Sequence, residues 1–280
     1  MFGRNRLDVK TPDQIRRMRR AGLVVGDTLA LLREQVRAGM TTADLDRMAE
    51  EHIRGAGATP SFLGYHGFTG TLCVSVNDEV VHGIPGSREL REGDLVSIDC
   101  GAIVDGWHGD AAISLVVGGR QAASPADLAL IDATEASMWA GIAALKVGSP
   151  LYAVGAAVED AVTEAAAADG ATYGIVEDYV GHGIGTEMHQ DPQVPNYRVR
   201  DKGPTVRSGL TVAIEPMVTL GSADTAILED DWTVVTTDGS RAAHWENSVA
   251  VTDEGLWVLT ELDGGRARLE ALGAAYAPLD

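Results

Sequence analysis

The fold of this chain is decided by a stretch that occurs twice, first as Arg91-Glu-Gly-Asp-Leu-Val-Ser-Ile-Asp99 and again as Arg207-Ser-Gly-Leu-Thr-Val-Ala-Ile-Glu215. Both copies read R-x-G-x-x-V-x-I-acid, so each is an apolar β-type run that ends in a carboxylate. The copies are 116 residues apart, and the same offset separates His66 in Tyr-His-Gly from His182 in Gly-His-Gly. Because a single insertion would break this agreement, we infer that the chain contains two related halves.

Helical patterns precede the strand-rich part of each half. In the first half, Thr11 can cap a helix that has Pro12 in its first turn, and Gln14 completes a capping box. In the second half, Ser124 followed by Pro125 repeats this kind of start. Apolar residues then recur at helical spacing, and glycines mark the ends. We expect helices over residues 11–39, 41–54, 125–148 and 150–169.

This arrangement predicts an α+β fold. Its two halves, each with helices on one side and antiparallel strands on the other, would meet at a shared interface. We expect an N-terminal tail over residues 1–10, a single domain over 11–262 with halves of roughly 11–120 and 121–262, and a C-terminal helix and tail over 263–280. An interface between pseudosymmetric halves is a natural place for a central site.

The composition indicates a globular protein and excludes several classes of function. Of the 280 residues, 45% are hydrophobic, and the formal net charge is −19. Such an acidic chain is not expected to bind DNA or anionic membranes, because basic surfaces drive that binding. The sequence has no apolar run of the roughly 20 residues that span a bilayer, no signal-peptide pattern at its start and only two cysteines. We therefore expect a cytoplasmic protein that is not stabilised by disulfide bonds.

The stretch from Leu95 to Asp110 is typical of a β-hairpin with Asp105-Gly106 as its turn. Two carboxylates, Asp99 and Asp110, interrupt its apolar residues. A carboxylate in a buried strand is costly unless it is paired or binds a metal. Because the two strands of a hairpin lie side by side, Asp99 and Asp110 can approach each other on one face.

Three residues of the second half have the same character. Glu215 and Glu246 each border an apolar strand, and the glycines beside His182 allow a close approach of the backbone. Four carboxylates and one imidazole carry about four negative charges, which two divalent cations would neutralise. This oxygen-rich set suits Mn²⁺, Fe²⁺ or Co²⁺ and also accepts Zn²⁺. A two-metal cluster can hold a bridging hydroxide and polarise a carbonyl, so the set favours hydrolysis of an amide or ester.

Six motifs carry a resemblance to a known family. They are Tyr65-His-Gly-Phe68, Val74-Ser-Val-Asn-Asp-Glu-Val-Val-His82-Gly-Ile-Pro85, the Asp99 to Asp110 hairpin, Gly181-His-Gly-Ile-Gly with His189, Ile214-Glu-Pro-Met217 and Trp245-Glu246. In order and spacing, over roughly residues 11–253, the chain resembles the type I methionine aminopeptidases of the pita-bread metallopeptidase family. One such motif alone is weak evidence, whereas the ordered set is highly specific. The 33 residues between His182 and Glu215 leave no room for the subdomain that type II members insert there.

The resemblance implies a pita-bread fold around a central site for two divalent cations, with Co²⁺, Mn²⁺, Fe²⁺ and Zn²⁺ all remaining candidates. Asp110 and Glu246 would bridge the two ions. His182 and Glu215 would hold one ion, and Asp99 would hold the other.

The resemblance also assigns catalytic roles to three residues. Glu215 would accept the proton of the attacking water in addition to binding a metal. His82 would contact the scissile amide and help to protonate the leaving nitrogen. His189 would hydrogen-bond the substrate carbonyl as negative charge builds on it.

The implied substrate is a polypeptide with an N-terminal methionine and a small second residue. By resemblance, the apolar pocket for the methionine side chain is lined by Tyr65, Phe68, Cys73, Met188 and Trp232, with Phe62 and His66 nearby. Met188 stands where many relatives carry Phe, and Phe62 where some carry Cys, so the pocket remains apolar but differs in shape. The expected partners are nascent polypeptides and the ribosome near its exit tunnel, and we expect a monomer.

Three other readings of the sequence stay open. Relatives of the aminopeptidase P and prolidase type share the fold but usually carry an N-terminal domain, whereas the first helix here is expected to begin at Thr11. Non-catalytic relatives that bind partners typically lack metal ligands, and all five are present here. A general esterase is a weaker alternative, because Gly181-His182-Gly183 is no nucleophile elbow.

Overall fold

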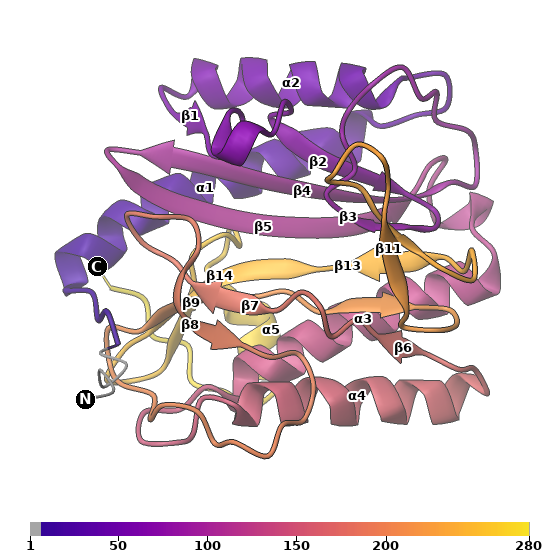
Figure 1. Cartoon of the computed structure of the whole chain (residues 1–280). Helices are drawn as coiled ribbons and strands as arrows, with labels where there is room; N and C mark the ends of the chain where they lie inside the picture. Colours follow the sequence, from indigo (N-terminus) through magenta and orange to yellow (C-terminus); the bar gives the residue numbers. More distant parts are fainter. Residues whose placement is uncertain (1–6, 280) are drawn as a thin grey trace.

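The computed structural model describes residues 7–279 (Figure 1). The predicted tail over residues 1–10 therefore lies largely outside the described residues. The α-helices are α1 (Pro12–Gln35), α2 (Thr42–Gly55), α3 (Pro125–Ala144), α4 (Ala153–Asp169) and α5 (Arg266–Ala271), and short 3₁₀ turns cover Tyr65–Gly67 and Arg120–Ala122. The strands are β1 (Thr59–Pro60), β2 (Leu72–Val76), β3 (Glu79–Val81), β4 (Leu95–Val104), β5 (Trp107–Val116), β6 (Gly174–Ile175), β7 (Gly181–Gly183), β8 (Gln190–Val194), β9 (Thr211–Ile214), β10 (Met217–Thr219), β11 (Thr225–Ile227), β12 (Val234–Thr236), β13 (Ala242–His244), β14 (Glu246–Val251) and β15 (Leu256–Val258).

The predicted starts of α1 and α2 are confirmed by their caps. The Thr11 side chain accepts a hydrogen bond from the Gln14 N–H, and the Gln14 side chain accepts one from the Thr11 N–H. Thr41 and Asp44 form the same reciprocal capping box at α2. Each box satisfies backbone donors that the first helical turn leaves without an intrahelical partner.

Three predicted helix boundaries are wrong by a few residues because other backbone pairings compete. Helix α3 ends at Ala144 rather than Gly148, whose N–H donates to the Val206 carbonyl. Helix α1 ends at Gln35 rather than Gly39, since Gly39 instead adopts a φ of 88° and donates its N–H to the Leu90 carbonyl. Helix α4 begins at Ala153 rather than Pro150, because the N–H of Leu151 bonds to the Pro204 carbonyl. In all three places a distant segment pairs with residues that local propensity assigns to the helix.

One antiparallel sheet carries most of the strands, in the order β1-β4-β5-β14-β9-β7-β8, with β2 also paired to β4 and β15 to β14. The predicted hairpin is confirmed, since β4 and β5 pair from Leu95↔Val116 to Val104↔Trp107. Asp105 and Gly106 form its two-residue turn with φ values of 52° and 78°. Two positive φ values are what a tight hairpin turn of this twist requires.

The two predicted halves of the sheet meet where β5 pairs with β14, at Ala111↔Asn247 and Ala112↔Glu246. In Figure 1, α1 and α2 lie with the strands of the first half at the top, and α3 and α4 lie at the bottom. The predicted α+β class is confirmed. None of the helices within residues 7–279 is long and apolar enough to cross a membrane.

Helix α1 approaches the sheet closely beside the residues that matter for the site. Gly22 of α1 lies against Gly109 of β5, where a Cβ on Gly109 would come within 2.6 Å of the Gly22 nitrogen. Only glycine permits this contact between backbones. The contact fixes α1 against β5 directly before Asp110.

Candidate metal centre and active site

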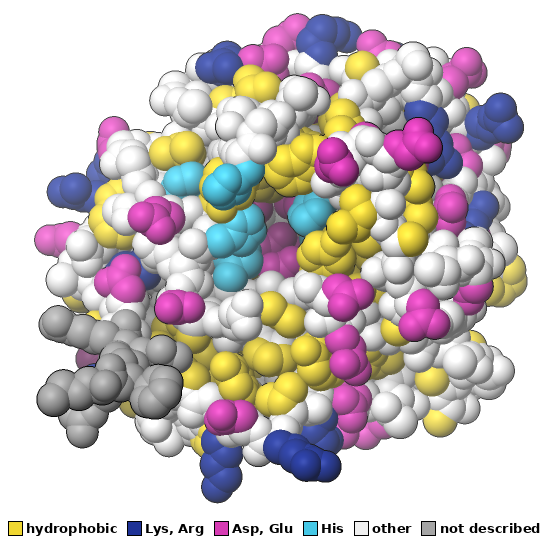
Figure 2. Space-filling view, viewed as in Figure 1, with side chains coloured by type: hydrophobic (Ala, Val, Ile, Leu, Met, Phe, Trp, Pro, Cys, Tyr) yellow, Lys and Arg dark blue, Asp and Glu magenta, His cyan; other side chains and the backbone are white. Residues whose placement is uncertain are grey.

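A cavity of about 280 Å³ opens between the two halves of the sheet. Figure 2 shows histidine side chains around this hollow and acidic side chains at its floor. All fourteen residues predicted for the site line it, and the structure leaves none of them elsewhere: Phe62, Tyr65, His66, Phe68, Cys73, His82, Asp99, Asp110, His182, Met188, His189, Glu215, Trp232 and Glu246. Four further residues that sequence reasoning missed complete the lining: Val81, Asp178, Tyr179 and Val180.

Strand register brings the four carboxylates together. Asp99 pairs with Ala112 and Asp110 with Gly101, so the two aspartates are diagonal neighbours on one face of β4 and β5. Glu246 is the first residue of β14 and also lies opposite Ala112. Because Ile214 pairs with Asn247, Glu215 follows β9 at the level of Glu246.

The donor atoms of this set suit a divalent cation. Ligand atoms of Asp110, His182 and Glu246 all lie within 4.8 Å of one another. One oxygen each of Asp99, Asp110 and Glu246 is buried and accepts no hydrogen bond from the described part of the chain. Buried carboxylate oxygens without donors are costly unless a cation is bound. The residues present therefore fit the predicted metal site.

Burial raises the pKa values of these carboxyl groups. The pKa of Asp99 is raised to about 7. The pKa values of Asp110, Glu215 and Glu246 are also raised, first by burial and then by the neighbouring carboxylates. A cation among them would favour the ionised forms, because it supplies the opposite charge that the protein itself does not.

His182 is held in the tautomer that a metal ligand needs. Its Nδ1 lies 3.0 Å from the Gly183 carbonyl oxygen, to which an Nδ1–H donates. The Nε2 lone pair is then free and lies 3.4 Å from Oε1 of Glu215. Burial lowers the pKa of His182 to about 3, so its ring is neutral at pH 7.

The two accessory histidines lie on either side of the cavity. Nδ1 of His189 is 2.9 Å from the Tyr65 hydroxyl, and its ring centroid is 4.3 Å from that of His182. The ring of His82 contacts Tyr179 and Trp232 edge-on, at centroid distances of 5.4 and 6.1 Å. Burial lowers the pKa of His82 to about 4, which keeps it neutral at pH 7.

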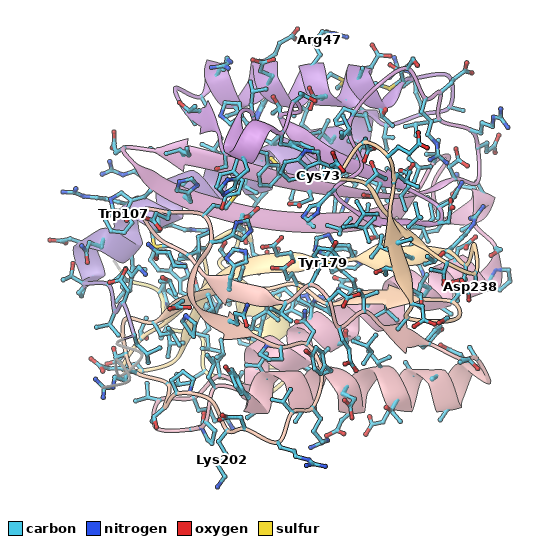
Figure 3. The ribbon with its side chains drawn as sticks, viewed as in Figure 1. Arg47, Cys73, Trp107, Tyr179, Lys202 and Asp238 are labelled. Atoms are coloured by element: carbon cyan, nitrogen blue, oxygen red, sulfur yellow. The ribbon has the colours of Figure 1, made fainter. Side chains whose placement is uncertain are left out.

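The apolar end of the cavity is a small cluster of its own. Phe62, Phe68, Cys73 and Met188 are buried there, and Tyr65, Ile84 and Trp232 pack against them. The rings of Phe68 and Trp232 meet edge to face at 5.0 Å. Burial raises the pKa of the Cys73 thiol well above its usual value, so this cysteine is a wall of the pocket rather than a nucleophile. In Figure 3, Cys73 lies above Tyr179, which is near the middle of the molecule.

His244 is a buried imidazole that sequence reasoning did not assign to the site. Its Nε2 lies 3.9 Å from Oε2 of Glu215 and 4.0 Å from Oε2 of Glu246. A signal for it exists in the sequence, since residues two apart in an extended chain share a face and His244 is two residues before Glu246.

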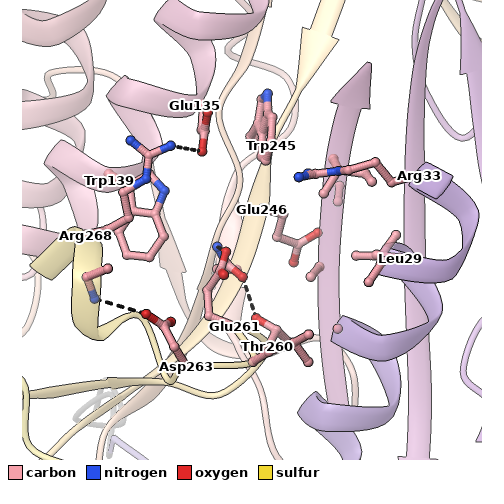
Figure 4. A pocket seen from close by; sticks show the side chains of 18 of the residues that line it. Leu29, Arg33, Glu135, Trp139, Trp245, Glu246, Thr260, Glu261, Asp263 and Arg268 are labelled. Carbon is pink, nitrogen blue, oxygen red and sulfur yellow. Dashed lines mark hydrogen bonds and ion pairs between the residues drawn. The ribbon is translucent and has the colours of Figure 1, made fainter. Parts of the chain in front are cut away.

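A larger cavity of about 530 Å³ lies behind β14 (Figure 4). Its walls include Leu29 of α1, Trp139 of α3 and Glu261 after β15. Asn247 also lines it, and Glu246 borders both cavities. The histidines and the apolar cluster belong to the smaller cavity, which is therefore the candidate site.

Known proteins share this chain's sequence over most of its length. It is 51% identical to a protein named Methionine aminopeptidase 1 from Mycobacterium tuberculosis (strain CDC 1551 / Oshkosh), over 92% of this chain and 96% of that protein. It is 44% identical to Methionine aminopeptidase 1 of Bacillus subtilis (strain 168), over 90% of this chain and 98% of that protein.

Solved structures share its fold. The crystal structure of methionine aminopeptidase from Thermotoga maritima superposes with a TM-score of 0.86 at 37% identity, over 91% of this chain and all of that one. Prolidase from Pyrococcus furiosus has a TM-score of 0.71 at 19% identity, and this chain covers 65% of its length. The prolidase shows a shared fold alone. The predicted pita-bread fold is confirmed by these neighbours.

The model of metallopeptidase family M24 matches residues 16–253, which include every predicted ligand. Together with the relatives above 40% identity, this match decides the family. The chain belongs to metallopeptidase family M24 and, within it, to the methionine aminopeptidases.

Proposed function

We propose that this chain is a methionyl aminopeptidase that hydrolyses the peptide bond after an N-terminal methionine when the second residue is small. The observation that carries the proposal is the arrangement of one cavity, in which four buried carboxylates and His182 lie beside a compact apolar pocket. The relatives named methionine aminopeptidase support the same activity.

The metal ligands we propose are Asp99, Asp110, His182, Glu215 and Glu246, with Asp110 and Glu246 shared between two divalent cations. Their unpaired buried oxygens and the free Nε2 of His182 support this set. Divalent cations bound there would supply Lewis-acid activation of water and of the substrate carbonyl. Co²⁺, Mn²⁺, Fe²⁺ and Zn²⁺ all suit the donors.

Three side chains would move or hold protons. The Glu215 carboxylate accepts the proton of the attacking water. His189 donates from Nε2 to the substrate carbonyl, which requires its Nδ1 to accept from the Tyr65 hydroxyl 2.9 Å away. His82, which is neutral and contacts Tyr179 and Trp232, contacts the scissile amide and relays to the leaving nitrogen the proton that Glu215 has taken from the water.

The pocket sets the preference for methionine. Its walls are two phenylalanines, a cysteine and a methionine, with Tyr65, His66 and Trp232 at its edge. A polarizable, unbranched thioether fills such an irregular apolar space well. The flexible Met188 side chain adapts the end of the pocket to its ligand.

The setting we propose for this activity is cytoplasmic. The enzyme would act as a monomer on nascent polypeptides near the ribosome exit tunnel, without binding DNA or a membrane. The catalytic domain would span residues 11–262, with the halves 11–120 and 121–262, between a tail over 1–10 and a C-terminal helix and tail over 263–280. The net charge of −19 supports the absence of a general affinity for nucleic acid.

Peptide hydrolysis tests the proposal directly. Chelator-stripped protein is supplied with Mn²⁺, Co²⁺ or Fe²⁺ and incubated with Met-Ala-Ser, Met-Phe-Ser and Ala-Pro-Gly. Metal-dependent release of methionine from Met-Ala-Ser alone is expected. Cleavage of Ala-Pro-Gly instead would move the chain to the prolidase-like branch of the fold. Binding of metal without any hydrolysis would favour a partner-binding role.

A further inference from the structure

His244 is buried, with 1% of its surface exposed, and its Nε2 exchanges no hydrogen bond with any residue that the structure describes. A buried polar nitrogen without a partner is unusual in a folded protein and needs an explanation. The nitrogen faces Oε2 of Glu215 at 3.9 Å and Oε2 of Glu246 at 4.0 Å. Ligand atoms of these three residues all lie within 4.8 Å of one another.

The two distances exclude a direct hydrogen bond but match a shared cation. An N–H···O hydrogen bond requires about 3.2 Å or less between the heavy atoms. Two ligands that each lie about 2.0–2.2 Å from one ion can be separated by up to about 4 Å. A cation between His244, Glu215 and Glu246 would therefore satisfy the nitrogen and both oxygens together.

The backbone of His244 is fixed for such a role. Its N–H donates to Oγ of Ser114 at 2.9 Å, and its carbonyl accepts from the same hydroxyl at 2.8 Å. Strand β13 also pairs His244 with Met217, two residues after Glu215. These contacts fix the backbone at His244 and leave Nε2 of its ring unused.

We propose that His244 is a further ligand of this metal cluster, in which its Nε2 joins the Glu215 and Glu246 carboxylates in holding a cation. The proposal rests on the proposed function, because it adds a second imidazole to the same metal cluster. Glu215 then lies between two imidazoles, with Oε1 toward His182 and Oε2 toward His244. A neutral imidazole adds a donor without adding negative charge to a cluster of four carboxylates.

The experiment counts the imidazoles that bind the metal. Co²⁺ is titrated into the full-length, metal-free protein, and exchangeable ring N–H signals shifted by the paramagnetic ion are recorded by proton NMR. The wild-type protein is expected to show signals of two imidazoles, and His244→Gln of one. His244→Asn provides a second variant, and circular dichroism shows whether each variant is folded. His108→Gln is the matched control, because His108 contacts Ser61 rather than a carboxylate.

Isothermal titration with Co²⁺ provides an independent readout. His244→Gln is expected to lose one class of binding event or to bind it at least tenfold more weakly. Unchanged NMR signals and binding isotherms in folded variants would overturn the role of His244 while leaving the proposed function intact. Absence of Co²⁺ binding to the wild-type protein would instead overturn the metal cluster itself.

Discussion

The carboxylate of Glu215 is the residue on which the proposed chemistry depends most. It is 9% exposed, and its Oε1 lies 3.4 Å from Nε2 of His182. Since the position combines a metal ligand with a proton acceptor, one substitution removes both functions. Glutamine keeps the side-chain volume of Glu215 but loses both the anionic metal ligand and the proton acceptor. The substitution therefore tests the chemistry without disturbing the fold.

Glu215→Gln is expected to lower kcat for Met-Ala-Ser by at least about 10²-fold, because general-base catalysis alone contributes 10²–10⁴-fold. The circular dichroism spectrum should be unchanged. Glu254→Gln, at an exposed position, is the control and should retain wild-type kinetics. Near-normal kcat in Glu215→Gln would contradict the assignment.

The Tyr65 hydroxyl orients His189, which is proposed to donate a hydrogen bond to the substrate carbonyl, and substitutions can test the two residues separately. Loss of a preorganised oxyanion donor costs about 2.7–4 kcal/mol of transition-state stabilisation. Loss of one orienting hydrogen bond costs about 1 kcal/mol. We therefore expect His189→Ala to reduce kcat strongly and Tyr65→Phe to reduce it by a few fold, with little change in KM. Little change in kcat for His189→Ala in a steady-state assay would make His189 a structural residue.

At the scale of secondary-structure elements, two serines join the halves of the sheet where backbone pairing between β5 and β14 stops. The Ser248 hydroxyl accepts from the Asp110 N–H at 3.1 Å and donates to the Asp110 carbonyl at 2.8 Å. Ser114 makes the equivalent pair of bonds with His244. Each hydroxyl thereby satisfies a buried donor and a buried acceptor next to the metal site.

Ser248→Ala is expected to lower the free energy of unfolding by roughly 2–4 kcal/mol, because it leaves the buried N–H and carbonyl of Asp110 without partners. Urea unfolding of the metal-free protein measures this change. Ser87→Ala, at an exposed position, should change the value by less than about 0.5 kcal/mol. A similarly small change in the free energy of unfolding of Ser248→Ala would show that the junction of β5 and β14 tolerates the loss of the hydroxyl.

The elements also show where sequence prediction loses accuracy. The starts of α1 and α2 follow from capping residues within four positions of each other, so local chemistry determines them. The end of α1 and the start of α4 depend on carbonyls of Leu90 and Pro204, which are distant in the chain. Such competition is invisible to propensity and periodicity.

For the whole molecule, the pH dependence of stability follows from acids that folding buries. Burial raises the pKa of Glu261 above its usual value of 4.5, although Asn247 Nδ2 donates to it at 3.3 Å. Because its pKa is higher in the folded state than in the unfolded state, protonated Glu261 adds to the free energy of unfolding. This contribution is complete below pH 4.5 and is lost as the pH rises through the folded-state pKa. The neutral side chain of Gln would not incur this loss.

Glu261→Gln is therefore expected to raise the Tm relative to wild type more at pH 8 than at pH 5. Thermal unfolding of both proteins at the two pH values measures this difference in Tm. The metal ligands are the same in both proteins, so their contribution to the pH dependence cancels. Glu270→Gln, at an exposed position, should show the same Tm difference at both pH values. If the Tm difference between Glu261→Gln and wild type is the same at both pH values, burial of the ionised Glu261 carboxylate does not destabilise the fold.

The sequence by itself determined the α+β class and the β4–β5 hairpin, because turn residues and apolar runs are local features. The fourteen site residues predicted from the sequence, most of them by family resemblance, line one cavity of the structure. The equal offset of the two repeats also indicated two related halves with a central site at their interface. Only the tertiary structure decided that His244 faces Glu215 and Glu246, and that Asp178 and Tyr179 complete the wall. These contacts depend on strand register and on how loops from the two halves pack, and neither of these can be read from local sequence patterns.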